Sequence, residues 1–414
     1  LRLYSGDSNH RIMQEAVLGL GGIKALDSLG YNCIKTYHMN EGHCSFLTLE
    51  LLKRYNGDEE KVRSRCHFTT HTPVPAGHDQ FDMSNCRKIL GDQLPLTLNL
   101  KTLKEENRLH MSELGLFFSQ SANGVSRLHR DIAQDQFPQF NLEYITNGVH
   151  HVTWMGKYFS KLFDKKIPDW RSDPDLLRSL VMIEDRDIEV AHTKQKELLI
   201  NEAGLQDNIL SKDILTIGFA RRSTEYKRAR LIFNDIDRLI EIGKNKIQIV
   251  FSGKAHPKDF GGKDIIRDIV DVSKRVEDRI KIVFLENYNM RLGKLITSGV
   301  DIWLNTPLRP NEASGTSGMK AALNGVPNLS ILDGWWAEGC KNGVNGWAVG
   351  DPEHPDDEKD ADHLYSVLEN SVIPTFYNDR NKWISMMKEA IKTGVDFTAH
   401  RMIMEYNQKF YQEK

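Results

Sequence analysis

The chain has 414 residues, of which 40% are hydrophobic and 27% charged, a balance typical of a folded protein with two or three domains. The net charge of -2 argues against a nucleic-acid-binding protein, and no apolar run approaches the about 20 residues of a membrane-spanning helix. The five cysteines lack paired spacing, which predicts neither disulfides nor a zinc site and favours reduced thiols in a cytoplasmic protein.

The first part of the chain mixes helical and strand patterns. Residues 11–29 carry apolar side chains near a 3.6-residue spacing, which predicts a helix, and residues 44–55 predict a second one. Short apolar runs at 33–37 and 66–70 predict strands that each run into a polar loop. Two prolines hold the loop after the second run extended.

The second part alternates between strand and helix. Residues 164–208 predict a polar helical connector, and residues 382–414 a final helix that returns to the first domain. Between them, each apolar run is followed by a polar loop and a helical segment; the runs are 214–220, 247–252, 280–285 and 300–304. This alternation predicts a parallel, doubly wound sheet, whose ligands bind beyond the carboxyl ends of the strands.

Cations and glycines follow two of these runs. Arg221, Arg222, Lys227 and Arg228 lie within eight residues, and arginine and lysine match phosphate oxygens. The loop 314–318 has two glycines and opens a helix predicted over 319–324, and a helix amino end is an anion site. One such segment alone is typical of a solvated surface. Their convergence at one edge favours a crevice for more than one phosphate.

The loop before Lys320 is not a P-loop, because Met319 separates Gly318 from the lysine, and this disfavours a nucleotide triphosphatase. We expect Lys320 in the first helical turn, where the helix dipole and nearby cations lower its pKa, as an imine-forming lysine requires. The alternative is a surface lysine.

Two further features leave alternatives open. His71 follows a strand, and either a substrate role or a buried, hydrogen-bonded loop histidine fits its position. The pair Trp335-Trp336 could stack on sugar, but core packing is favoured.

The segment Glu312–Lys320, with Asn324-Gly325 and Leu332-Asp333-Gly334, resembles the cofactor-lysine segment of glycogen and α-glucan phosphorylases. Further motifs follow in the family's order along essentially the whole chain, at residues 3–7, 14–15, 40–43, 71–75, 147–149 with Trp154, 225–228 and 286–288. The motif Gly334-Trp335-Trp336 resembles the short bacterial and archaeal branch.

This resemblance implies an α/β fold of glycosyltransferase-B architecture, with two Rossmann-like doubly wound domains facing a cleft. We expect the first domain to be incomplete, because the family's glycine-rich phosphate loop comes before Leu1. Residues 1–154 would be the remainder of a glucan-binding domain, 155–395 the pyridoxal phosphate-binding domain, and 396–414 a helix returning toward the first domain.

The resemblance also implies pyridoxal 5′-phosphate held as an imine by Lys320, and no metal. The reaction would be reversible phosphorolysis of terminal α-1,4-bonds of glycogen, starch or maltodextrin by inorganic phosphate. It gives glucose 1-phosphate with retention, while the 5′-phosphate of the cofactor passes a proton. We expect a cytoplasmic homo-oligomer that binds neither nucleic acid nor membrane.

The family's site residues map onto this chain in three groups. The catalytic group is Lys320, Arg222, Lys227 and His71. The cofactor group is Lys320, Thr316, Ser317, Tyr288, Trp154 and Arg221. The substrate group is Asn147, Glu312, Ser314, Gly315, Asp7 and Glu41. Two positions depart from the family: Arg221 stands where lysine is commoner, and Asn289 where the long enzymes carry a phosphate-contacting arginine. That contact is either missing or replaced, with Arg291 as a candidate.

Two other hypotheses remain. One is a glucan synthase-like glycosyltransferase that uses a nucleotide sugar on the same architecture. The other is an inactive α-glucan-binding protein.

Overall fold

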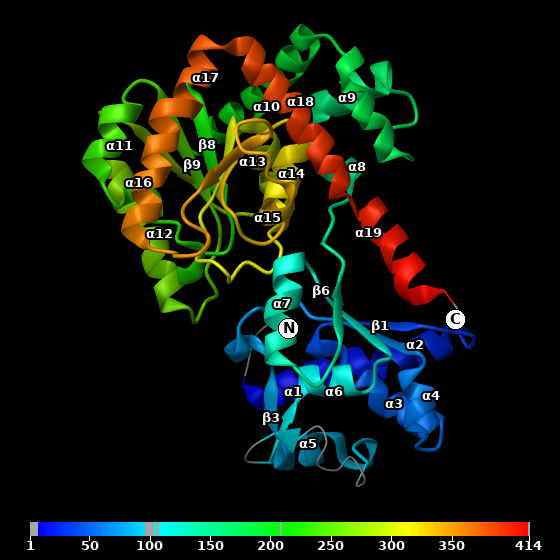
Figure 1. Cartoon of the computed structure of the whole chain (residues 1–414). Helices are drawn as coiled ribbons and strands as arrows, with labels where there is room; N and C mark the ends of the chain where they lie inside the picture. Colours follow the sequence, from blue (N-terminus) through cyan, green and yellow to red (C-terminus); the bar gives the residue numbers. More distant parts are fainter. Residues whose placement is uncertain (1–6, 96–102, 105–106, 208, 413–414) are drawn as a thin grey trace. The chain divides into compact units, whose positions relative to one another are not determined.

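The computed structural model describes residues 7–95, 103–104, 107–207 and 209–412 (Figure 1). The chain forms two compact units. Unit 1 comprises Leu1–Thr146 with Glu405–Lys414, and unit 2 comprises Asn147–Met404. Residues 3–6 of the first motif lie outside the described residues.

Unit 1 is built around a four-stranded parallel sheet of order β1-β2-β6-β7. A small antiparallel sheet of order β3-β5-β4 is inserted in the sequence between β2 and β6. Its elements are α1 (Ser8–Ala16), a π-helical turn (Val17–Gly21), α2 (Gly22–Ser28), β1 (Tyr37–Asn40), α3 (Leu47–Arg54), α4 (Glu59–Arg63), β2 (Cys66–Thr69), β3 (Gln80–Asp82), α5 (Met83–Leu90), β4 (Leu103–Lys104), β5 (Arg108–His110), α6 (Met111–Phe117), β6 (Ser121–Gly124), α7 (Arg127–Gln136) and β7 (Leu142–Tyr144).

Two predicted elements of unit 1 differ from the structure. The helix predicted over 11–29 is interrupted by the π-helical turn, where a Cβ on Gly19 would lie 2.7 Å from the backbone nitrogen of Leu47. The strand predicted over 33–37 is wrong, since β1 begins at Tyr37. The reason is burial: Cys33 and Lys35 are exposed, whereas Tyr37 and Met39 enter the core.

The carboxyl-terminal residues complete the packing of unit 1. Helix α19 (Ala399–Tyr406) is followed by a π-helical turn, Asn407–Tyr411. The Phe410 ring stacks on the ring of buried His67, with 4.2 Å between centroids. The amide of Asn123 donates to the hydroxyl of Tyr406 at 3.0 Å. The end of the chain is therefore part of this unit's core.

Unit 2 contains a six-stranded parallel sheet of order β10-β9-β8-β11-β12-β13, which confirms the predicted parallel α/β organisation. Its elements are α8 (His151–Trp154), α9 (Lys157–Lys166), α10 (Asp185–Gly204), β8 (Leu215–Ala220), α11 (Ile236–Gly243), β9 (Ile247–Ser252), α12 (Phe260–Arg275), β10 (Lys281–Leu285), α13 (Met290–Gly299), β11 (Ile302–Asn305), α14 (Thr316–Leu323), β12 (Asn328–Ile331), α15 (Trp336–Gly339), β13 (Gly346–Val349), α16 (Asp357–Val367), α17 (Ile373–Asn378) and α18 (Arg380–Asp396).

Helices cover both faces of this sheet (Figure 1). Alternate strand residues point to opposite faces, so Ile302 and Leu304 join the core under α11, α12 and α16, while Trp303 joins the core under α10, α13 and α14. Trp335 and Trp336 are each 1% exposed, in agreement with core packing.

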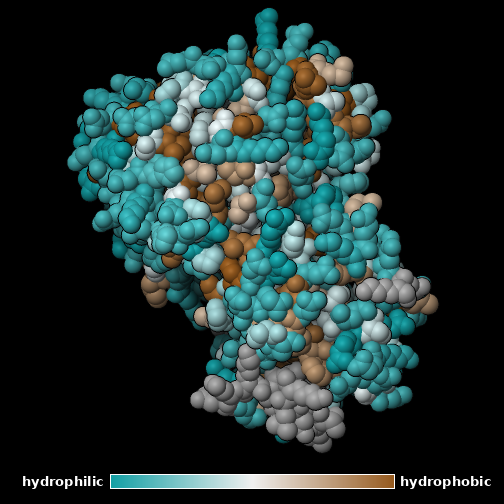
Figure 2. Space-filling view, in the orientation of Figure 1, coloured by the Kyte–Doolittle hydropathy of each residue, from teal (hydrophilic) through white to brown (hydrophobic). Residues whose placement is uncertain are grey.

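Hydrophilic residues cover most of the surface seen in Figure 2, with small hydrophobic areas between them. Among the described residues, no helix combines the length and apolar composition needed to cross a bilayer.

Candidate active site

The strand order of unit 2 reverses between β8 and β11, and ligands of such sheets bind in the crevice at this switch point. The loops that follow these two strands touch each other. The backbone nitrogen of Leu308 donates to the carbonyl of Tyr226 at 2.7 Å. The Arg228 guanidinium donates to the carbonyls of Thr306 and Pro307, both at 3.0 Å. Side chains from both loops therefore meet at the carboxyl edge of the sheet.

The centre of this edge is a buried cluster of charges. The Nζ atom of Lys227 lies 2.7 and 2.6 Å from the two carboxylate oxygens of Glu312. The Nη2 atom of Arg221 donates to Glu312 Oε2 at 2.6 Å, and its Nη1 atom donates to Asn305. Two predicted cations and one predicted sugar-binding acid are thus in direct contact.

Burial and charge shift the pKa values of this cluster. Burial lowers the pKa of Lys227 to about 7, and the charges of Arg221 and Arg222 act in the same direction while Glu312 opposes them. Burial alone would raise the pKa of Glu312, but Arg221 and Lys227 bring it below its ordinary value. Arg222 is exposed at the rim. Arg221, Arg222 and Lys227 thus lie near two carboxyl groups, those of Glu312 and of Asp333, and burial raises the pKa of Asp333 to about 7.

The loop before α14 supplies polar atoms that have no partner. Gly315 precedes the helix in the left-handed conformation, with φ of 84°. The hydroxyls of Ser314 and Ser317 are buried without a hydrogen-bond partner, as are Arg221 Nε and the Thr224 hydroxyl. Buried polar groups normally find partners, so these orphaned donors fit a site that receives the oxygens of an anion.

Lys320 lies on α14 with its Nζ atom 3.8 Å from the centre of the Trp154 ring. Burial lowers its pKa to about 8, with no other cause. The expectation of a first-turn position is wrong, because α14 begins at Thr316 and Lys320 is its fifth residue. The lowered pKa is present, with burial as its cause.

Asn324 joins the two segments that carry Lys320 and Trp154. Its Nδ2 atom donates to the carbonyl of Trp154 at 2.9 Å, and its Oδ1 atom accepts from the nitrogen of Gly156 at 2.6 Å. This fully buried residue belongs to the lysine motif, but its positioning role was not predicted.

Tyr288 lies on the same edge, because it follows the carboxyl end of β10. Burial raises its pKa, and the charge of Arg221 opposes this shift. Asn289 caps α13 and accepts from the Leu292 nitrogen at 3.0 Å. Arg291, expected to replace an arginine at position 289, instead pairs with Glu202 at 2.5 Å and is exposed. The Asn147 carbonyl accepts from Arg401 at 3.0 Å.

The other predicted residues belong to unit 1. The Glu41 carboxylate accepts from the His71 nitrogen at 2.6 Å, the Thr72 hydroxyl at 2.9 Å and the Gly42 nitrogen at 3.0 Å. Glu41 itself has φ of 75°, which is unusual for a non-glycine residue. The His71 ring contacts the Asn40 side chain at 2.6 Å, and burial lowers its pKa. Asp7 is exposed and caps α1 through the nitrogen of His10. In this structure Glu41 therefore holds the His71 loop.

Glu15, His43 and Asp79 of unit 1 place ligand-type atoms within 4.8 Å of one another. A guanidinium already occupies this cluster: Arg11 Nη2 lies 2.6 Å from Asp79, 3.0 Å from His43 and 3.1 Å from Glu15. The arrangement is an ion-pair network that ties α1 to two loops.

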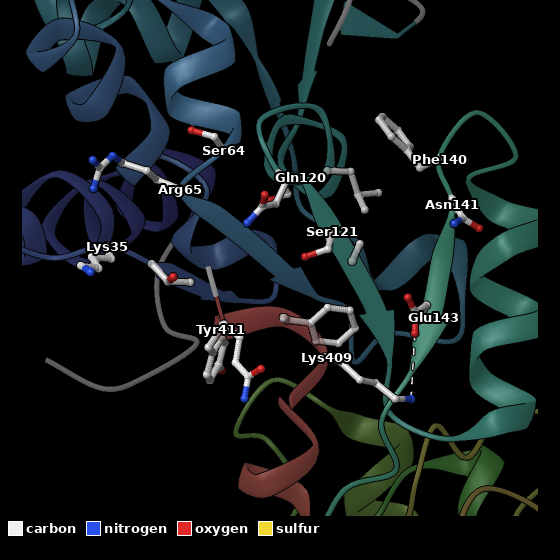
Figure 3. A pocket seen from close by; sticks show the side chains of 16 residues that line it. Lys35, Ser64, Arg65, Gln120, Ser121, Phe140, Asn141, Glu143, Lys409 and Tyr411 are labelled. Atoms are coloured by element: carbon white, nitrogen blue, oxygen red, sulfur yellow. Dashed lines mark ion pairs between the residues drawn. The ribbon is translucent and has the colours of Figure 1, made fainter. Parts of the chain in front are cut away.

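Unit 1 also contains a cavity of about 620 Å³ (Figure 3), which none of the predicted site residues lines. Its walls include Arg65, Gln120 and Asn141, which precede β2, β6 and β7. It therefore opens at the amino ends of the strands, whereas Glu41 and His71 follow the carboxyl ends of β1 and β2. Lys409 of the carboxyl-terminal turn faces Glu143 across it, at 3.9 Å.

A family model described as carbohydrate phosphorylase matches residues 68–340. The chain belongs to the carbohydrate phosphorylase family. Maltodextrin phosphorylase of Thermococcus litoralis is 41% identical over an alignment that covers 99% of this chain and 54% of that protein. Glycogen phosphorylase of Aquifex aeolicus is 37% identical, with 99% of this chain and 67% of the relative covered. An uncharacterized protein of Methanocaldococcus jannaschii is 32% identical, with 99% and 75% covered.

This phosphorylase-family chain spans about half to two thirds of the length of the first two relatives. The matched region of the family model contains both loops of the switch point and α14. It also contains Asp333, a buried residue whose contacts with the Glu312 segment were not predicted. The available signal was its position directly after a strand, within a motif that resembles the family.

Proposed function

We propose that this chain carries the catalytic site of an α-glucan phosphorylase, which cleaves terminal α-1,4-bonds with inorganic phosphate and releases α-glucose 1-phosphate with retention. The observation that carries the proposal is the carboxyl edge of unit 2, where Arg221 and Lys227 pair with Glu312 and hydroxyls of the segment 314–317 have no partner. The helix that follows carries Lys320, whose pKa burial lowers. The names of two relatives, maltodextrin phosphorylase and glycogen phosphorylase, support the same activity.

The residues present fit pyridoxal 5′-phosphate. Lys320 is the candidate for the covalent attachment, because its amine loses its proton more easily than that of an ordinary lysine. Trp154 and Tyr288 would border the ring, and Thr316, Ser317 and Arg221 would hold the phosphate, since the Ser317 hydroxyl and Arg221 Nε have no protein partner. When bound, the cofactor supplies a phosphate that donates and accepts a proton.

The chain's own residues would bind and orient the substrates. Arg222 and Lys227 are the candidates for inorganic phosphate, since the first is an exposed guanidinium and the second a buried amine on one loop. Glu312, Ser314, Gly315 and Asn147 would bind sugar hydroxyls. Asp7, Glu41 and His71 of unit 1 would serve the glucosyl unit, with Glu41 fixing the backbone of His71.

Preorganised charge would stabilise the reaction. Cations that are already in position would stabilise the negative charge of phosphate while the glycosidic bond breaks. This stabilisation does not require water molecules to reorient during the reaction. The buried position of Lys227 and Arg221 strengthens this effect, because water screens charges less in a buried site.

We also propose that the two units represent the two Rossmann-like domains of the glycosyltransferase-B architecture, with limits near 1–154 and 155–395 and a returning segment at 396–414. The strand order of unit 2 supports this proposal, because it has the arrangement of a doubly wound dinucleotide-type fold. The cytoplasmic location and the homo-oligomer stay predictions.

The test is to incubate the purified holoprotein with maltodextrin and inorganic phosphate and to follow the products by ³¹P NMR. We expect α-glucose 1-phosphate to form only when both substrates are present. Glucan transfer that requires a nucleoside diphosphate glucose would favour a synthase instead, and glucan binding without any product would favour an inactive binding protein.

A further inference from the structure

Asp333 follows β12 and is completely buried. Its two carboxyl oxygens serve different backbone groups. Oδ2 accepts from the nitrogen of Glu312 at 2.9 Å, and Oδ1 accepts from the nitrogen of Gly334 at 2.8 Å. One buried side chain thus joins the turn after β12 to the loop before α14.

The residues after Asp333 hold the same loop at further points. The nitrogen of Trp335 donates to the carbonyl of Ser314 at 2.8 Å. Gly334 has φ of 54°, and a Cβ there would lie 2.4 Å from the Ser314 carbonyl oxygen and 3.0 Å from that of Glu312. Only glycine fits this close approach of two backbones.

The segment held in this way carries the Glu312 side chain. Its carboxylate lies between Lys227 and Arg221, at 2.6 Å from each. Gly315 closes the other side, since a Cβ there would lie 3.2 Å from Cγ of Glu312. A small shift of the Glu312 backbone would therefore misdirect its carboxylate.

We propose that Asp333 is a positioning residue, which fixes the backbone of Glu312–Gly315 and thereby sets the direction of the Glu312 carboxylate and of the Ser314 hydroxyl. The inference rests on the proposed function, in which this segment binds sugar hydroxyls. Asp333 itself does not touch the substrate, because it has no exposed surface.

The energetics favour this role. Burial raises the pKa of Asp333 to about 7, and the charge of Glu312 acts in the same direction. The two backbone hydrogen bonds oppose this shift. Such a group destabilises the fold unless its contacts compensate. Its two acceptors match two donors on adjoining segments, which an apolar side chain would leave unpaired.

The test compares Asp333→Asn with the wild-type holoprotein. The amide nitrogen of asparagine would face one of the two backbone donors. We expect faster hydrogen exchange in peptides that cover 312–315 and a KM for maltodextrin raised about tenfold, the effect of leaving one buried donor unpaired. The Kd for inorganic phosphate should rise less than this KM, because Glu312 holds Lys227 but Arg222, the other phosphate candidate, is exposed and outside these ion pairs.

Two further variants complete the comparison. Gly334→Ala disturbs the same turn from the other side, and it should give the same pattern at a larger cost in stability. Asp301→Asn is the control at the opposite end of the strands: this buried aspartate of unit 2 accepts from the Thr216 nitrogen at 2.7 Å and pairs with Lys196 at 2.5 Å. It should lower thermal stability without changing exchange at 312–315.

Unchanged exchange at 312–315 in both turn variants would overturn the proposal, and so would equal increases in the maltodextrin and phosphate constants. A wild-type protein without phosphorolysis would contradict the proposed function instead. The exchange comparison would then decide alone whether Asp333 anchors the segment.

Discussion

Both carboxylate oxygens of Glu312 accept hydrogen bonds from Lys227 Nζ, at 2.7 and 2.6 Å. Arg221 shares the same carboxylate at 2.6 Å. A single negative charge therefore holds two cations at this edge. This relationship explains how the edge stays folded, since unpaired buried charges are costly.

Glu312→Gln removes the counter-ion of these two cations. We expect the free energy of unfolding of unit 2 to fall by about 3 to 5 kcal/mol, the usual effect of breaking a buried ion pair on one side. All seven tryptophans of the chain lie in unit 2, so urea unfolding followed by tryptophan fluorescence reports on this unit. Inorganic phosphate should restore part of the loss.

The matched control is Glu225→Gln on the β8 loop, which also carries Arg221 and Lys227. Glu225 pairs with Arg230 at 2.9 Å, but both side chains are exposed, so we expect a change below about 1 kcal/mol. Equal effects of the two substitutions would rule out a special role of the Glu312 cluster.

Arg222→Ala tests the phosphate contact. We expect the KM for inorganic phosphate to rise about tenfold, as one charge-assisted hydrogen bond is lost, with little change in the KM for maltodextrin. Steady-state kinetics with each substrate varied in turn measures both values. Arg230→Ala, another exposed arginine of the loop, is the control. An unaltered phosphate dependence would remove Arg222 from the site.

Lys320→Ala should abolish covalent retention of pyridoxal phosphate and the activity, while far-UV circular dichroism stays unchanged. The absorbance of the bound cofactor after dialysis is the measurement. Lys294→Ala is a suitable control, because burial also lowers the pKa of that lysine, which lies on α13. If the Lys320 variant keeps the cofactor through dialysis, another lysine holds it.

Acid should destabilise unit 1. Burial lowers the pKa of His38 to about 4 and that of His67 to about 3 from an ordinary value of 6.5. The unfolded chain then binds more protons than the folded one, so stability is lost as the pH falls from about 6.5 toward 4. His38 contacts Tyr411 at 2.5 Å and His67 stacks on Phe410, so acid should loosen the carboxyl-terminal turn.

Hydrogen exchange of peptides from residues 405–412 at several pH values measures this effect. His67→Gln keeps a polar side chain that does not titrate, and it should flatten the pH dependence. The control is His354→Gln, which removes an exposed histidine of unit 2. A pH dependence identical in wild type and His67→Gln would show that other groups control the loss.

Much of unit 2 could be predicted from the sequence, because its strands are buried on both faces and therefore consist of continuous apolar runs. The run 247–252 became β9 without change. The start of α14 was predicted late, at Met319, since Thr316-Ser317-Gly318 has low helix propensity. Long-range contacts fix that turn, including Trp335 against Gly318.

Unit 1 could be predicted less well. The predicted bounds of β1 were wrong because Ile34 is only partly buried, and the local composition does not reveal its burial. The same limit applies to the site. Lys227, Glu312 and Arg221 could be predicted from the sequence only as separate candidates. Their ion pairs form because two loops meet at the carboxyl edge of the sheet, although Lys227 and Glu312 are 85 residues apart in the chain. Asp333 was visible only as a motif residue, since the backbone donors from which it accepts are brought together by the fold.

Borohydride reduction of the purified holoprotein, followed by peptide mass mapping, tests whether Lys320 holds pyridoxal phosphate. We expect a phosphopyridoxyl adduct on the peptide that contains Lys320 and on no other lysine. An unmodified Lys320 in a protein that still releases glucose 1-phosphate would contradict this expectation.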